Sequence, residues 1–174
     1  LMQLQKDAMT PEEIEVLTSQ MIKSVKNTLD LLDNLLHWSR SQMNLMKMNV
    51  QPINLNELVD DTFNLLALNA QSKNIELVKN TQENCQVMVD AHMIDIVIRN
   101  LVSNAIKFTT EGSVTVHCQE TSDHQIEVTV QDTGVGIAPE DAQKLFKVDS
   151  HYTTEGTNRE KGTGLGLLLC KELI

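Results

Sequence analysis

The spacing of the apolar residues changes at a polar break, residues 49–52, and this change divides the chain into two parts. Before the break, apolar residues recur every three, four or seven positions, which is typical of a stripe along one helix. Thr10-Pro11-Glu12-Glu13 combines a cap hydroxyl, a first-turn proline and a capping glutamate. We therefore predict a long helix from Thr10 to about Met48. The stripe comprises Ile14, Leu17, Met21, Val25, Leu29, Leu32, Leu36, Met43 and Met46.

A second apolar row, Leu31, Leu35 and Trp38, makes the stripe wider than a lone surface helix needs. The helix is therefore predicted to pack in a bundle, with residues 1–8 as the end of a preceding helix. We assign residues 1–50 to this partial helical hairpin and expect it to form a homodimer. Residues 51–174 form the second predicted domain.

The second part mixes helices and strands without a repeating strand–helix–strand order, so its predicted fold class is α+β. Helices are predicted at 56–72 and 91–108, and a short helix from Ala138 to Phe146. Strands are predicted at 75–79, 87–89, 114–118 and 126–130, with the turn of a hairpin at 122–124. Alternation in the last two strands indicates that one face of the sheet is buried.

Composition excludes several classes of function. The chain of 174 residues is 41% hydrophobic, enough for a core, and carries a formal net charge of -10 without a basic cluster. Nucleic acid and anionic lipid are therefore poor partners. No run reaches the roughly 18 apolar residues that span a bilayer, so we expect no membrane contact. Cys85, Cys118 and Cys170 lack the spacing of a zinc site or a disulfide framework, and we expect them to be reduced and buried.

Asn100 and Asn104 lie four residues apart on the predicted helix 91–108, hence on one face, and Lys107 is on the next turn. An asparagine oxygen is a suitable ligand for Mg²⁺, and lysine supplies a positive charge for a phosphate. The three side chains can therefore converge on one ligand. The same spacing occurs on ordinary solvated helix faces, so this motif alone leaves both interpretations open.

The segment from Asp132 to Ile137 follows the last predicted strand and contains two glycines. A carboxylate there can accept a hydrogen bond from an exocyclic amine such as that of adenine, and the glycines permit close approach by a flat ring. An ordinary glycine-rich turn has the same composition. A calcium loop is disfavoured because the alternating acidic ligands are missing.

The glycine-rich segment Gly162-Thr163-Gly164-Leu165-Gly166 precedes an apolar run that should be helical. Free amides and a helix N-terminus there would suit a polyphosphate. The spacing matches neither the Rossmann nor the Walker motif. The polar stretch 149–161 before it is typical either of a lid over a nucleotide or of a surface loop.

These three segments occur in the order found in histidine kinase ATP-binding domains, which the chain resembles. Residues 100–108 are similar to that family's N box, residues 132–137 to its G1 box, residues 162–167 to its G2 box, and Phe146 to its F box. The likeness extends upstream through the helix that contains His37. It implies the Bergerat-type sandwich that is shared by gyrase-like topoisomerases, heat-shock chaperones, mismatch-repair ATPases and histidine kinases.

The resemblance implies roles for individual positions, with ATP and Mg²⁺ as ligands. Asn104 would be the Mg²⁺ ligand, and Asn100 and Lys107 would contact phosphates. Phe108 would form a wall near the nucleotide, and Asp132 would read adenine. The predicted nucleotide-binding set consists of Asn100, Asn104, Lys107, Phe108, Asp132, Gly134, Gly136, Ile137, Lys161, Gly162, Thr163, Gly164, Leu165 and Gly166.

Asn100 departs from the pattern of the hydrolytic members of this superfamily. Those members resemble one another in carrying a glutamate four residues before the magnesium asparagine, as general base for water. An amide cannot take a proton from water near neutral pH. We therefore predict phosphoryl transfer to another residue rather than efficient ATP hydrolysis.

The accepting histidine of the family is followed by an acidic residue and, five positions later, by proline, and none of the five histidines here fits. We expect that histidine to precede Leu1, and the domain, cut short inside a helix at Ile174, to continue with further strands. The predicted activity is that of a protein-histidine kinase whose phosphoryl group passes to the receiver domain of a response regulator. The predicted location is the cytoplasm, and a position in the cytoplasmic part of a membrane-anchored sensor is compatible with this prediction.

Two alternatives belong to other classes. A degenerate kinase module could serve as a helical dimerisation platform that binds nucleotide weakly or not at all, although the intact motifs argue against it. A serine kinase of the anti-sigma type would share the fold, but it gives no reason for the long helical stripe.

Overall fold

The computed structural model describes residues 10–11, 13–18, 21–22, 25, 48–82, 85–123, 125–146, 153–160, 162 and 164–174. The predicted N-terminal helix begins where expected. The Thr10 hydroxyl accepts a hydrogen bond from the Glu13 N–H at 3.2 Å, and the Glu13 carboxylate accepts one from the Thr10 N–H at 2.8 Å. This reciprocal pair is the predicted capping box. Residues 1–9 and 26–47, with His37, lie outside the described residues.

A strand runs through the polar break at which we placed the boundary between the two predicted domains. β1 (Val50–Asn54) pairs antiparallel with β3 (Gln86–Asp90) in a two-stranded sheet. The prediction missed β1 because Pro52 argues against a central strand. Proline is tolerated here because β1 has a partner on one side only.

The main sheet has the order β2–β4–β5, in which β2 is Ile75–Thr81, β4 is Gly112–Glu120 and β5 is Ile126–Asp132. β2 and β4 are parallel, whereas β4 and β5 form the predicted antiparallel hairpin. The parallel pair needs a long crossover, which contains β3 and α3 (Ala91–Phe108). Helix α2 (Leu55–Gln71) precedes β2.

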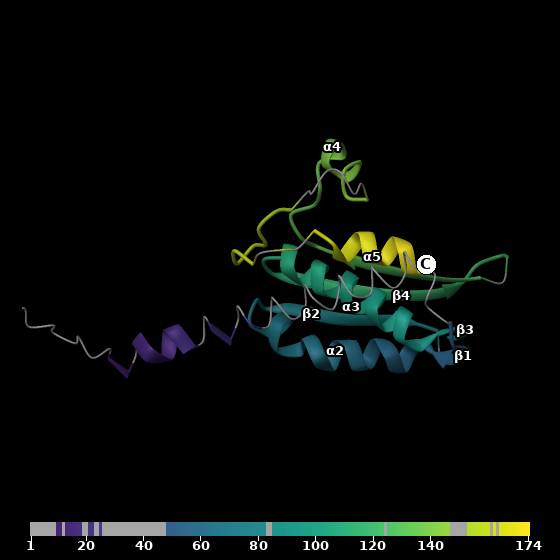
Figure 1. Ribbon diagram of the computed structural model, residues 1–174. Coiled ribbons are helices and arrows are strands. Elements are labelled where there is room, and N and C mark those ends of the chain that lie inside the picture. Colours follow the sequence, from purple (N-terminus) through teal and green to yellow (C-terminus); the bar gives the residue numbers. More distant parts are fainter. Residues whose placement is uncertain are drawn as a thin grey trace, which may run out of the picture.

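The core lies between the helices α2 and α3 and one face of the main sheet, which makes the domain a two-layer α+β sandwich (Figure 1). Alternate residues of β4 are buried, as the sequence pattern predicts. The core consists of Leu55, Val59, Leu66, Ala70, Ile75, Cys85, Ile98, Val102, Ala105, Ile106, Val114, Val116 and Cys118.

Two shorter helices complete the described chain. α4 (Pro139–Ala142) is followed by turns, so it ends before Phe146, where we predicted its end. α5 (Gly166–Leu173) lies alongside α3 (Figure 1). A second core cluster joins these two helices, with Leu169, Cys170 and Leu173 of α5 packed on Ile96 and Val97 of α3. This contact places the start of α5 beside the second half of α3.

The cysteines depart in part from the prediction. All three are buried as expected, and Cys170 is a free thiol whose pKa is raised by burial to about 11. Cys85 and Cys118, in contrast, form a disulfide across 33 residues. β2 ends at Thr81, which lies opposite Cys118 of β4. Cys85 follows soon after Thr81 in the chain and reaches Cys118 from there. No local spacing in the sequence reveals such a pairing.

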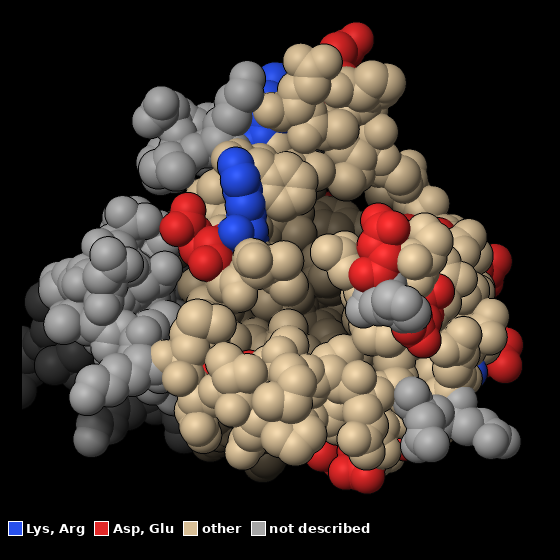
Figure 2. All heavy atoms as spheres, turned by 90° about the vertical axis from the view of Figure 1, so that its right-hand side faces the viewer, with Lys and Arg blue, Asp and Glu red and all other residues tan. Residues whose placement is uncertain are grey.

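The described surface carries scattered acidic side chains. Figure 2 shows the side of the molecule that lies at the right of Figure 1, where acidic residues lie on two sides of a hollow lined by uncharged atoms and a basic side chain lies near its upper rim. Among the described residues, no helix is both long enough and apolar enough to cross a membrane.

Candidate functional site

Helix α3 carries the first predicted motif in its C-terminal half. Asp90 caps the other end, where its Oδ1 accepts hydrogen bonds from the N–H groups of His92 and Met93 at 3.0 and 3.2 Å. Its Oδ2 accepts the Asn49 N–H at 2.8 Å, which is the largest cause of the lowered pKa of this carboxyl. Near the middle of α3, the side-chain amide of Asn100 donates a hydrogen bond to the Ile96 carbonyl at 3.0 Å. This bond orients the Asn100 Oδ1.

The glycine-rich segment before α5 lies directly against α3. A methyl group added at Gly166 would lie 2.9 Å from Oδ1 of Asn100, and one at Gly162 would lie 2.6 Å from Nζ of Lys107. Larger residues at these positions would displace two of the predicted ligand contacts. Leu165, which precedes α5, has no side-chain oxygen to cap the first amides of that helix. An anion there would gain from those amides and from the helix dipole.

The segment after β5 is held against the end of the same helix. Asp132 Oδ1 accepts the Gly134 N–H at 2.9 Å, and the Val135 N–H donates to the Phe108 carbonyl at 3.1 Å. A side chain at Gly134 would collide with that carbonyl. Val135 and Ile137 are exposed beside the exposed Asp132 carboxylate. An apolar surface next to an oriented acceptor suits a flat heterocycle with an exocyclic amine.

The structure therefore brings the three motifs together at the C-terminal half of α3. Asn104 lies one turn after Asn100 on that helix. Gly136, Ile137, Gly164 and Leu165 lie in the two loops that approach it. Lys161 and Thr163 lie outside the described residues.

The residues present fit a magnesium ion that arrives with a polyphosphate. Among the described side chains, no group of three or more His, Cys, Asp or Glu is placed to hold a metal by itself. Mg²⁺ in nucleotide sites takes most of its ligands from phosphates and water, so one protein oxygen can be sufficient. The Asn104 side chain carries an oxygen of this kind. Gly166 has no Cβ, which would lie 2.9 Å from Oδ1 of Asn100, one turn earlier on the same helix as Asn104.

Lys107 is the cation among the described residues of the predicted nucleotide-binding set. Its Nζ donates to the Thr154 carbonyl at 3.2 Å and lies 4.6 Å from the centroid of the Phe108 ring. Burial lowers the pKa of Lys107, the nearby Glu160 carboxylate acts in the opposite direction, and the charge of Lys73 lowers it further. Any added negative charge at the site would therefore favour the protonated form of this amine.

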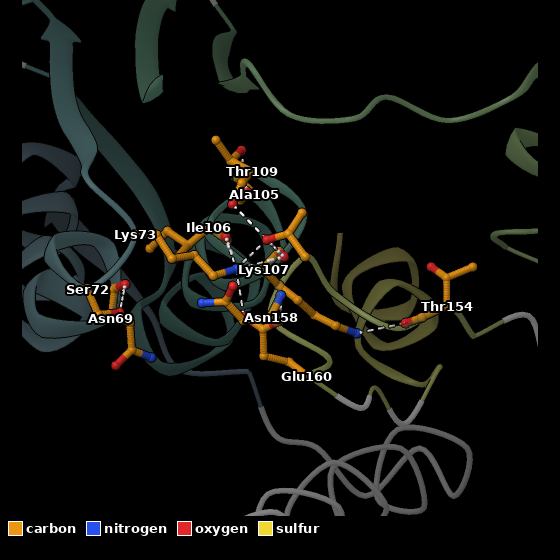
Figure 3. Close-up of polar contacts among 11 residues, drawn as sticks. Asn69, Ser72, Lys73, Ala105, Ile106, Lys107, Thr109, Thr154, Asn158 and Glu160 are labelled. Carbon is orange, nitrogen blue, oxygen red and sulfur yellow. Dashed lines mark hydrogen bonds and ion pairs between the residues drawn. The ribbon is translucent and has the colours of Figure 1, made fainter. Parts of the chain in front are cut away.

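Sequence reasoning missed the residues that support Lys107, which are Lys73, Thr157 and Glu160 (Figure 3). The described part of the segment predicted to be a lid or a surface loop, residues 153–160, is held to α3 by these contacts. Lys73 lies at the end of the predicted helix 56–72, where a lysine is unremarkable. Its partner Thr157 is 84 residues away, so no motif marks the set.

Comparisons with known proteins bear on the family and the fold of the chain. The family model described as "Histidine kinase-, DNA gyrase B-, and HSP90-like ATPase" matches residues 89–174. The sensor protein GacS of Pseudomonas syringae pv. syringae is 34% identical over 177 residues, which cover 98% of this chain and 19% of GacS. The chain thus spans about a fifth of the length of this curated relative.

Two solved histidine kinases have similar structures. The nucleotide-free catalytic domain of ThkA is 31% identical with a TM-score of 0.63, covering 73% of this chain and 80% of that one. Full-length ShkA in complex with AMPPNP is 24% identical with a TM-score of 0.76, covering 98% of this chain and 35% of ShkA. The α+β fold is therefore that of histidine kinase ATP-binding domains, the Bergerat fold.

Proposed function

This chain belongs to the family of histidine kinase-, DNA gyrase B- and HSP90-like ATPases, and on that premise we propose that it binds ATP with Mg²⁺ as the kinase module of a two-component sensor. In the whole protein, the bond from the γ-phosphorus to its bridging oxygen breaks, a phosphorus–nitrogen bond to a histidine of the helical hairpin forms, and ADP leaves. The phosphoryl group then passes to an aspartate of a receiver domain.

One observation carries this proposal: an adenine-type acceptor, a lysine amine and an uncapped helix start meet at one end of α3. Asp132 holds the adenine amine, and Phe108 forms a wall beside it. Asn100 and Lys107 orient the phosphates, which lie at the start of α5. When bound through Asn104, Mg²⁺ supplies charge neutralisation at the phosphates.

The chemistry at Asn100 favours transfer over hydrolysis. Its amide nitrogen is a donor to the Ile96 carbonyl, and its oxygen has no basicity with which to activate water. The likeness to named sensor kinases supports this choice. The structural likeness to ThkA in complex with the response regulator protein TrrA, at 24% identity and a TM-score of 0.72, covers 97% of this chain and 46% of that one. We propose a receiver domain as the partner on this basis.

Calorimetric titration with a non-hydrolysable ATP analogue, with and without Mg²⁺, tests the proposed site. Asp132→Asn should weaken binding by about 1–3 kcal/mol, because one charge-assisted hydrogen bond to adenine is lost. Asp123→Asn makes the same chemical change at the opposite end of the β4–β5 hairpin and should bind as the unchanged chain does. Equal affinity in the two variants would refute the role of Asp132, and absence of binding to the unchanged chain would refute nucleotide binding.

A second role, as a dimerisation platform, is favoured by the N-terminal helix. Its described residues expose large apolar side chains that a single chain leaves uncovered, which are Ile14, Val16, Leu17, Met21, Ile22 and Val25. We propose that residues 1–50 form a helical hairpin that pairs with a second copy, and that residues 51–174 form the ATP-binding domain. Sedimentation at several concentrations should show a dimer that Leu17→Glu dissociates. A concentration-independent monomer would refute the pairing.

A further inference from the structure

Lys73 is a buried lysine with a complete set of partners. Its side chain is 5% exposed, and lysines are rarely buried to this extent unless they are paired. The Nζ atom lies 2.6 Å from Oε1 of Glu160 and 2.8 Å from the Thr157 hydroxyl. It also donates to the carbonyls of Ile106 and Lys107 at 3.0 and 2.9 Å. Every proton of the ammonium group therefore has an acceptor.

These acceptors come from two segments that are far apart in the sequence. Ile106 and Lys107 form the last turn of α3, where carbonyls have no partner within the helix. A cation at this end is favoured by the helix dipole. Thr157 and Glu160 belong to the turn that precedes the glycine-rich segment. Lys73 thus joins the end of α3 to this turn.

The turn has contacts of its own that keep it in place. The Thr157 N–H donates to the Lys107 carbonyl at 3.0 Å, and the Thr157 hydroxyl lies 3.0 Å from the Thr109 carbonyl. Glu160 Oε2 accepts the Asn158 N–H at 2.7 Å. Gly156 packs so closely on Lys107 that a methyl group there would lie 2.9 Å from the Lys107 carbonyl oxygen. The turn and the last residues of α3 therefore form one unit.

The Lys107 side chain leaves the same helical turn in a different direction. In Figure 3 its amine extends away from Lys73 toward Thr154, to which it donates. Lys73 holds the backbone carbonyl of Lys107, whereas within the described residues the Lys107 amine donates one hydrogen bond, to Thr154. A ligand phosphate can therefore replace the Thr154 carbonyl while the base of the side chain stays in place.

We propose that Lys73, Thr157 and Glu160 form a buried latch that positions the Lys107 amine for the nucleotide phosphates. Lys73 is a positioning residue, since it acts through Lys107 and touches no ligand. The inference rests on the proposed function, because the phosphates are those of ATP. It adds a specific expectation: the latch affects phosphate recognition and leaves adenine recognition unchanged.

The test compares two ligands, AMPPNP and adenosine, in the complete chain. Lys73→Met removes the ammonium and keeps the length of the side chain, and Glu160→Gln removes only the carboxylate charge. Both should weaken AMPPNP binding, Lys73→Met by about tenfold, and should change adenosine binding by less than about twofold. Lys79→Met is the matched control, because Lys79 pairs with Asp60 on the exposed surface.

A double-mutant cycle separates positioning from general damage. If Lys73 acts through Lys107, Lys73→Met should have no further effect on AMPPNP binding once Lys107→Met is present. Hydrogen exchange gives a readout that needs no nucleotide. The Thr157 N–H should exchange at least about tenfold faster in Lys73→Met, while amides in the middle of α3 keep their protection.

Each outcome decides a different claim. Absence of AMPPNP binding to the unchanged chain would overturn the proposed function and the role of the latch with it. Binding to the unchanged chain with equal affinity in Lys73→Met and Glu160→Gln would overturn the latch alone. Equal weakening of adenosine and AMPPNP would also overturn it, because the variant would then have damaged the whole site. If Lys73→Met does not fold, Glu160→Gln decides, since it keeps the carbonyl contacts of Lys73.

Discussion

The two ends of α3 are capped in different ways. At the first end, Asp90 accepts hydrogen bonds from residues two and three positions ahead, and Asn49 adds one contact. At the second end, Lys73 satisfies the last carbonyls from another part of the chain, and Thr157 binds the same turn. The first end is stabilised mainly by neighbours in sequence, and the second by long-range contacts.

This difference coincides with the position of the site. The locally capped end carries no predicted ligand contact, whereas the other end carries Asn100, Asn104, Lys107 and Phe108. Local capping supports the helix alone. Capping by distant segments also fixes those segments relative to the helix, and this is what a site assembled from one helix and two loops requires.

The largest expected effect on stability is at the second end. Lys73→Met removes a donor from the carbonyls of Ile106 and Lys107 and from the half-buried Glu160 carboxylate, and should lower the free energy of unfolding by about 2–3 kcal/mol. Urea unfolding followed by circular dichroism measures this change. A loss no larger than that of Lys79→Met would show that the ammonium adds little to the fold.

A smaller loss is expected at the first end. Asp90→Ala removes the N-cap acceptor of α3 and should cost about 1 kcal/mol, because water can solvate the exposed amides that it leaves. The same unfolding experiment applies, and AMPPNP affinity should stay within about twofold. A loss greater than that of Lys73→Met would reverse the comparison between the two ends.

Lowering the pH should weaken the contacts at both ends of α3, those of Glu160 at the second end before those of Asp90 at the first. Burial raises the pKa of Glu160, but the hydrogen bonds from Lys73 and from backbone N–H groups outweigh it, so the folded pKa lies below the ordinary 4.5. The pKa of Asp90 is lowered below 3.8, chiefly by the Asn49 N–H. A carboxyl with a lowered pKa stabilises the fold above its unfolded pKa, and this contribution is lost as the pH falls through the folded value.

The free energy of unfolding should therefore decrease as the pH is lowered from about 6 to 3. Glu160→Gln should flatten the part of the decline that begins near pH 4.5, and Asp90→Asn the part that begins near pH 3.8. Parallel curves for the unchanged chain and both variants would contradict the assignment of these two carboxyls.

The smallest expected effect on stability is at Lys107. Its pKa is lowered mainly by burial, so the folded state binds this proton more weakly than the unfolded chain does. The charge is therefore a slight cost at neutral pH, and Lys107→Met should leave the free energy of unfolding equal or slightly higher. AMPPNP binding should fall by about tenfold or more. A clear loss of stability would mean that the bond to Thr154 outweighs the cost of burial.

Sequence patterns were sufficient for the helices α2 and α3, for the hairpin of β4 and β5 and for the capping box at Thr10, because each depends on neighbouring residues. The resemblance supplied the order of the three motifs, and the structure places their described residues together. β1 was missed because its pairing with β3 outweighs the local signal of Pro52. The Cys85–Cys118 disulfide and the contacts of Lys73 were missed because segments distant in sequence create them.

The distance in sequence between Lys107 and Thr157, 50 residues, sets an order of events during synthesis. A ribosome delivers the chain from its N-terminus, so Asp90 can cap α3 as soon as the first turn of that helix has emerged. The other end must wait until residues 157–160 have been made. Throughout that interval a nascent chain would hold a helix that is capped at one end only, with the backbone of Lys107 not yet fixed by Thr157. Assembly of the proposed site thus follows the synthesis of every residue in the main core cluster of this domain.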